Sequence, residues 1–202
     1  MGLKFEAKEG DTELSHEELD LIIPGHVTTR KQLDEVEQNN IEEAFQWLLS
    51  LKTIEASKLF SEEFQDLLHK KMFGNVWKWG GEQRKKETNV GVKPNQIVVE
   101  RKKLNEDALF WIHNNTWDPT ETALRFHHRL VQIHCYPNGN GRHSRIIADT
   151  ILEKIYNKDP LTWIYSDLLN DTKGRREYIS ALKAADKGDY SLLIKSVEKT
   201  TK

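Results

Sequence analysis

The segment HCYPNGNGRHSR, from His134 to Arg145, decides how the rest of the chain is interpreted. A turn that contains Gly139 and Gly141 leads into an apolar helical pattern that carries Arg142 and Arg145. The start of a helix has backbone N–H groups without internal partners and a dipole that favours negative charge. Glycines let such a turn approach a ligand closely, and paired guanidinium groups suit phosphate oxygens. The segment therefore predicts a phosphate-binding helix start.

His134 adds a group that a pure binding loop would not need. An imidazole accepts a proton near neutral pH, and Asn140 tolerates positive φ and can donate from its amide. We hypothesise that His134 deprotonates a hydroxyl group that attacks a phosphate held by the turn. Taken singly, a histidine at a helix end, a Gly-Asn-Gly turn and an arginine pair each have an ordinary structural explanation. Only their joint spacing indicates a site.

The sequence around this segment has the apolar spacing of a mainly helical protein. One helix is predicted after Asp118, which can cap it, with Pro119 at the first helical position and Glu121 at the capping-box position. In all, helices are predicted over 33–50, 60–72, 104–112, 119–133, 146–155 and about 174–198.

Residues 84–100 show a different pattern. Val90 and Val92 alternate with polar or small residues, Pro94 marks a turn, and the run Ile97–Val99 is β-branched. We predict a short β-hairpin here, with a plain surface ribbon as the alternative.

The composition bounds the class of protein. The chain has 202 residues, 30 basic and 32 acidic side chains and a net charge of −2, which fits one soluble domain with no general affinity for nucleic acid or membranes. It has one cysteine, so an internal disulfide is impossible. The sequence shows no signal peptide and no stretch near the roughly 18 apolar residues of a membrane helix. A cytoplasmic protein is the expectation.

The motif resembles the signature of the Fic family (filamentation induced by cAMP), which reads His-x-Phe-x-(Asp/Glu)-Gly-Asn-Gly-Arg-x-x-Arg. The flanking segments 68–92 and 175–197 are also similar to that family. The opening, residues 10–49, resembles the bacterial subfamily called mobile mystery protein B. The positions that match the motif are His134, Gly139, Asn140, Gly141, Arg142 and Arg145.

The resemblance implies a Fic-type helical bundle with one β-hairpin flap. Residues 1–32 would be an N-terminal arm and 33–202 a single Fic domain, with its active-site loop at 134–145. The implied activity is transfer of AMP from ATP to a hydroxyl side chain of a target protein that docks at the 84–100 hairpin. His134 would be the base, the loop residues Gly139–Gly141 would bind the phosphates, and Arg142 and Arg145 would hold the polyphosphate.

Two positions depart from the signature. Tyr136 replaces Phe, so a buried hydroxyl needs a partner. Asn138 replaces the acidic residue that would hold Mg²⁺, and it offers a carbonyl oxygen without the charge. The resemblance thus leaves two functions open: an adenylyltransferase with weakened or altered metal dependence, and a catalytically impaired module that binds nucleotide and protein.

The acidic segment LDEVEQN, residues 33–39, can be aligned with an inhibitory helix that many family members carry. Glu37 then takes the position of the inhibitory glutamate and would pair with Arg145. Leu33 and Gln38 depart from that pattern, and a solvated acidic helix face is the alternative.

A zinc site built from His127, His128, His134 and Cys135 is a further alternative, although their spacing matches no usual zinc pattern. The sequence names neither the target protein nor the oligomeric state.

Overall fold

The computed structural model describes residues 20–27, 29–163 and 172–198, and this part of the chain is mainly α-helical, as predicted. A 3₁₀ turn, η1 (Pro94–Gln96), precedes α5, and a π-helical turn, η2 (Ile151–Ile155), extends α7. The α-helices are α2 (Arg30–Ser50), α3 (Ala56–Leu59), α4 (Glu62–Phe73), α5 (Ile97–Asn114), α6 (Pro119–Ile133), α7 (Asn140–Thr150), α8 (Thr172–Ala185) and α9 (Ser191–Glu198).

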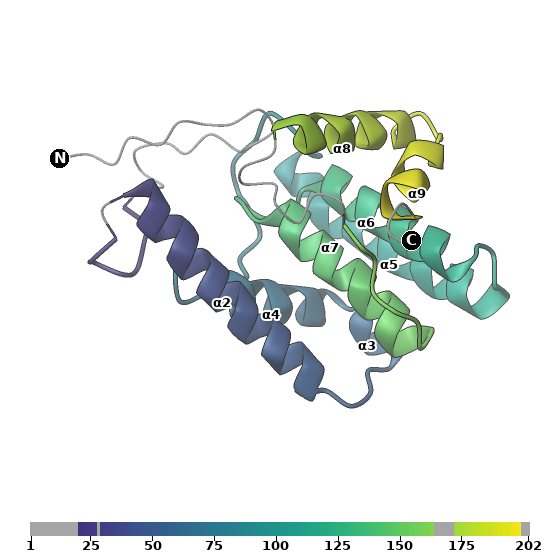
Figure 1. Ribbon diagram of the computed structural model, residues 1–202, viewed down its shortest axis with the longest axis horizontal. Coiled ribbons are helices and arrows are strands. Elements are labelled where there is room, and N and C mark those ends of the chain that lie inside the picture. Colours follow the sequence, from purple (N-terminus) through teal and green to yellow (C-terminus); the bar gives the residue numbers. More distant parts are fainter. Residues whose placement is uncertain (1–19, 28, 164–171, 199–202) are drawn as a thin grey trace.

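Helices α6 and α7 lie in the middle of the bundle, between α2 and α4 on one side and α8 and α9 on the other (Figure 1). The main apolar core is formed by side chains from α2, α4, α5, α6 and α7. It includes Leu68, Phe126 and Ile147, which are fully buried. Because α6 and α7 are held from several sides, the turn that connects them is fixed at both of its ends.

Local sequence explains where these helices begin. Asp118 accepts a hydrogen bond from the N–H of Glu121 at 3.1 Å, and Pro119 is the first residue of α6, as predicted. Helix α2 begins at Arg30, three residues before the predicted start, because Thr29 and Gln32 form a capping box. The predicted helix at about 174–198 is two helices, since Gly188 adopts φ +88° between α8 and α9.

The prediction of a β-hairpin at 84–100 is wrong for residues 97–100, which form the first turn of α5. Ile97 is fully buried, whereas Val98 and Val99 are about half exposed, and buried Arg101 and Leu104 continue a helical period. Burial at this spacing outweighs the β-propensity of three branched residues. Residues 84–93, all of them described, contain no strand and form an irregular segment.

The described part of the N-terminal arm contacts the domain. Ile22 forms an isolated antiparallel bridge with Trp77, and the N–H of Ile23 donates to the carbonyl of Val76 at 2.8 Å. The rest of the predicted arm, residues 1–19 and 28, lies outside the described residues. None of the described helices combines the length and apolar character that a membrane span requires.

Candidate active site

The predicted site lies in the turn from α6 to α7. His134 ends α6 in the left-handed conformation, with φ 57° and ψ 64°, and Gly139 precedes α7 with φ +77°. A Cβ at Gly139 would lie 2.4 Å from the ring of Phe73, so the turn needs glycine there for space as well as for backbone angle. The turn is thus pressed against α4.

His134 has the properties of a neutral base. Its residue is 9% exposed, and no described group hydrogen-bonds its Nε2 atom. Burial lowers the pKa of His134 to about 4; the nearby Arg84 guanidinium acts in the same direction and a hydrogen bond with the backbone of Val131 acts against it. Nε2 is therefore the ring nitrogen to which we assign the role of proton acceptor.

The start of α7 presents unused backbone donors. Within the described residues no acceptor is found for the N–H groups of Asn140, Gly141 and Arg142, as expected for a first helical turn. The side chain of Asn140 is engaged differently from the prediction. Its Oδ1 accepts from the N–H of Tyr136 at 2.9 Å and its Nδ2 donates to the carbonyl of Tyr136 at 2.8 Å. It therefore shapes the turn, and only its backbone N–H is available to an anion.

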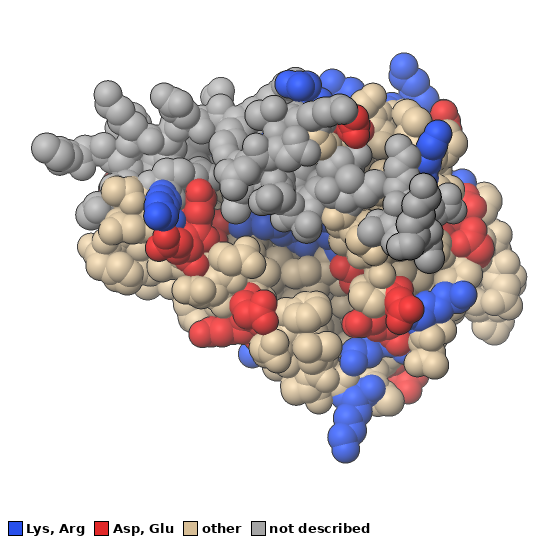
Figure 2. Space-filling view, viewed as in Figure 1, with Lys and Arg blue, Asp and Glu red and all other residues tan. Residues whose placement is uncertain are grey.

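The two arginines of the motif face different neighbours. Arg142 lies over the ring of Phe73 and forms an ion pair with Glu37, with Nη1 and Oε2 2.5 Å apart. Arg145 donates from Nε to the carbonyl of Gly141 and lies near the ring of Tyr178. In Figure 2, Lys and Arg atoms form a band in the middle of the face, next to acidic side chains on α2.

The predicted pairing of Glu37 with Arg145 is therefore wrong, because Glu37 pairs with Arg142. Arg145 lies three residues further along α7, where its side chain is directed toward α8. Glu37 is 5% exposed, so the alternative of a solvated helix face is also wrong. Its second carboxylate oxygen, Oε1, accepts from the indole Nε1 of Trp77 at 2.6 Å. The carboxylate is thus held from both sides.

Asn138 does not present a ready metal ligand. Its Oδ1 accepts from the N–H of Gly139 at 2.7 Å, and it carries no charge. Among the described residues, no group of three His, Cys, Asp or Glu side chains could hold a metal ion. The side chains of this site therefore do not fit Mg²⁺ bound by the protein alone.

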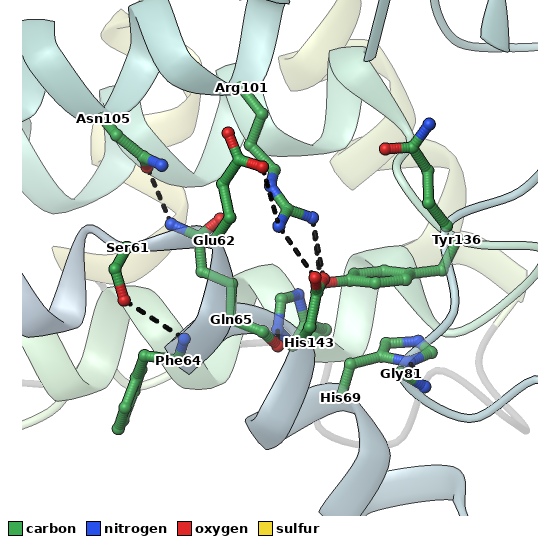
Figure 3. A network of polar contacts seen from close by, with 12 residues as sticks. Ser61, Glu62, Phe64, Gln65, His69, Gly81, Arg101, Asn105, Tyr136 and His143 are labelled. Carbon is green, nitrogen blue, oxygen red and sulfur yellow. Dashed lines mark hydrogen bonds and ion pairs between the residues drawn. The ribbon is translucent and has the colours of Figure 1, made fainter. Parts of the chain in front are cut away.

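A buried polar network connects the turn to the helices α4 and α5 (Figure 3). The hydroxyl of Tyr136, which is fully buried, donates to Oδ1 of Asp66 at 2.8 Å. The same carboxylate accepts two hydrogen bonds from the guanidinium of Arg101, at 2.8 and 3.0 Å. The tyrosine hydroxyl therefore has the partner that it needs, and the turn is tied to α4 and α5.

His69 fixes the other end of the turn. Its ring stacks on Tyr136, with 3.6 Å between ring centroids (Figure 3). Its Nδ1 accepts from the N–H of Gly81 at 3.0 Å, so Nε2 carries the proton and donates to the carbonyl of Asn138 at 3.1 Å. Burial and the nearby His143 lower its pKa well below the usual value, which keeps the ring neutral.

The alternative of a zinc site is contradicted. Nε2 of His127 is 2.8 Å from the hydroxyl of Tyr178, and His128 bonds to Tyr190 and Asp186. Burial raises the pKa of the Cys135 thiol to about 11, so the thiolate that binds zinc is disfavoured.

Comparison with known proteins identifies the domain. Residues 59–152 match the model of the Fic/DOC family, so this part of the chain is a Fic/DOC domain.

Curated relatives include the protein adenylyltransferase Fic of Drosophila willistoni, 28% identical over 162 residues, and that of Culex quinquefasciatus, 28% identical over 166 residues. The alignments cover 76% and 75% of this chain and 31% of each relative. This chain thus spans about a third of the length of the curated relatives it matches.

Solved structures show the same fold. Fic-1 from C. elegans superposes with a TM-score of 0.68 at 23% identity, over 89% of this chain and 51% of that one. The BepC protein of Bartonella tribocorum, solved with bound AMPPNP, superposes with a TM-score of 0.66 at 17% identity, over 91% and 97%. The chain therefore has a Fic-type helical fold.

Sequence reasoning missed several residues that shape this site. Trp77 and His69 were not predicted to contact it, and the prediction places Arg84 in the β-hairpin at 84–100. Only the need of Tyr136 for a hydroxyl partner pointed to the buried network in advance.

Proposed function

We propose that this protein is an adenylyltransferase that transfers AMP from ATP to a hydroxyl side chain of a target protein. The observation that carries the proposal is the free Nε2 of neutral, buried His134 at the turn that leads into the unpaired N–H groups of α7. The names of the curated relatives support the same activity, and the AMPPNP bound to BepC supports ATP as the donor.

In this proposal each group has one task. The N–H groups at Asn140 and Gly141, together with Arg142 and Arg145, bind the phosphates. Nε2 of His134 takes the proton of the incoming hydroxyl, whose oxygen forms a bond to the α-phosphorus as the bond to pyrophosphate breaks. The products are the AMP-modified side chain and pyrophosphate, with the proton on His134.

Glu37 is proposed to be inhibitory. Arg142 is engaged with its carboxylate, and a guanidinium in that ion pair is not free to bind phosphate. The ion pair must open for Arg142 to contribute, so α2 restrains the reaction.

No step of the proposal runs through Mg²⁺. The Asn138 amide supplies no charge, so any divalent ion would be held chiefly by the phosphates of the nucleotide.

The target is proposed to dock along residues 84–93, which lie next to the turn and are largely exposed. The likeness of residues 10–49 favours a bacterial protein of the mobile mystery protein B-like group, and we propose that it is cytoplasmic.

The second candidate is a module that binds nucleotide and a partner without turnover, and the observation that favours it is the neutral Asn138. Labelled ATP with Mg²⁺ or Mn²⁺ and a lysate separates the two. Label on protein, lost in His134→Ala while nucleotide still binds, supports the enzyme; binding without any label supports the module. Loss of binding in His134→Ala would contradict the assigned role of a base.

A further inference from the structure

The guanidinium of Arg84 donates hydrogen bonds to backbone carbonyl groups of two parts of the chain, the end of α6 and the segment 85–92. The residue is 3% exposed. Its Nε donates to the carbonyl of His134 at 2.6 Å and its Nη1 donates to that of Lys86 at 2.9 Å. Its Nη2 donates to the carbonyls of Val92 and Ile133. In the described residues, all of these partners are backbone oxygens, so the side chain joins the end of α6 to the segment 85–92.

The end of α6 is a place where such a cation is stabilising. The last carbonyl groups of a helix lack internal donors and form the negative end of its dipole. His134 also occupies the left-handed region, which is unfavourable for a residue other than glycine. A hydrogen bond to the carbonyl of His134 restrains the peptide plane after it, and thereby the backbone from which the imidazole projects.

The segment 85–92 is attached to the same place by its own backbone. The N–H of Arg84 donates to the carbonyl of Cys135 at 2.9 Å, and the N–H of Val92 donates to that of Ile133 at 3.3 Å. Gly91 has φ +106°, and a Cβ there would lie 2.6 Å from the Cβ of His134. The segment and the base are therefore in direct contact.

We propose that Arg84 is a positioning residue that holds the backbone of His134 and the segment 85–92 as one unit. The inference rests on the proposed function, in which His134 is the base and this segment receives the target. Arg84 also brings a positive charge close to the imidazole, which favours the neutral ring and so adds to the effect of burial. The effect of the hydrogen bonds of Arg84 and the effect of its positive charge can be separated by two different substitutions.

The test compares Arg84→Lys, which keeps the charge but cannot reach four carbonyl groups, with Arg84→Met, which removes charge and hydrogen bonds but keeps the aliphatic chain. Arg129→Lys on α6 is the control, because Arg129 pairs with Glu100 and contacts neither His134 nor the segment. The readouts are the pKa of His134 by NMR, hydrogen exchange of the Val92 amide, and kcat and KM for labelled ATP.

In Arg84→Met we expect the pKa of His134 to rise by about one unit and the Val92 amide to exchange at least about tenfold faster, with the fold retained by circular dichroism. In Arg84→Lys we expect the pKa to stay within about half a unit of wild type, and kcat to fall about tenfold. KM for ATP should change less than about twofold, since Arg84 contacts no residue of α7.

An unchanged pKa and unchanged Val92 exchange in Arg84→Met would overturn the proposal, as would full kcat in Arg84→Lys. If Arg84→Met does not fold, Gly91→Ala disturbs the same contact from the other side, and it should lower kcat without raising KM for ATP. If wild type transfers no label, the proposed function fails, while the NMR and exchange data still decide whether Arg84 holds His134.

Discussion

Oε2 of Glu37 lies 2.5 Å from Nη1 of Arg142, although 105 positions separate the two residues in the chain. The ion pair connects α2 to the first turn of α7 and occupies one of the two arginines proposed to bind the polyphosphate. Trp77 completes the arrangement by donating to the other carboxylate oxygen. A helix outside the motif thus reaches directly into the candidate site.

Glu37→Gly should increase transfer of label from ATP, at least severalfold, because it frees Arg142 for phosphate. Automodification with labelled ATP is the measurement. Glu35→Gly is the matched control: it makes the same change on the same helix, where Glu35 is exposed and pairs only loosely with Lys31. Equal activity in both variants and wild type would leave Glu37 with a purely structural role.

Asn138→Asp should raise activity in a manner that depends on Mg²⁺. The new carboxylate adds a charged oxygen ligand beside the phosphates, and hard cations prefer such ligands. Label transfer across a magnesium titration is the measurement, with wild type as the reference. A rate that does not respond to magnesium in the variant would show that position 138 does not contact the ion.

Tyr136→Phe should lower the free energy of unfolding by about 1 kcal/mol, the usual net value of one buried hydrogen bond. The variant loses the bond from the hydroxyl to Asp66, while the bonds between Asp66 and Arg101 remain. Urea denaturation is the measurement. Tyr156→Phe serves as the control, since its hydroxyl has only a long 3.5 Å contact with Thr122; a larger loss there would contradict the assignment.

Stability should depend on pH through the buried histidines. Burial lowers the pKa of His143 to about 3, whereas an unfolded histidine titrates near 6.5. Between these values the unfolded chain binds a proton that the folded protein does not. The contribution is therefore fully present above about pH 6.5 and is lost as the pH falls toward 3.

His143→Gln tests this point, because glutamine can still donate to the carbonyl of Gln65 that His143 bonds. The slope of unfolding free energy against pH from 6 to 4 should decrease by about 1.4 kcal/mol per pH unit in the variant. Asp149, whose pKa burial raises to about 7, has the opposite effect on the slope, but that effect cancels when variants are compared. His113→Gln, which replaces an exposed histidine on α5 in the same way, is the matched control.

The sequence predicted most of the helices because their buried residues recur at a period that a helix alone satisfies. It located the motif turn because His134, the glycines and the arginines are close together in the chain. Residues 97–99 were misassigned because branched side chains suit a strand as well as a buried helical turn, and only the position of Ile97 against the core decides between them.

The partners of the motif could not be predicted in the same way. Glu37 was singled out, but its pairing with Arg142 depends on how α2 lies against α4, which no local pattern specifies. Arg84 has no neighbouring feature that marks it, since its partners are carbonyl groups that every residue carries. Contacts between distant segments were therefore the part that required coordinates.

Gly91 restricts how this surface can diversify. Any side chain at that position would collide with His134, so a lineage that acquires new binding preferences has to vary the flanking exposed positions and retain this glycine. Sequence variation among relatives would then be concentrated at residues 85–90, while the glycine beside the imidazole of His134 would not vary.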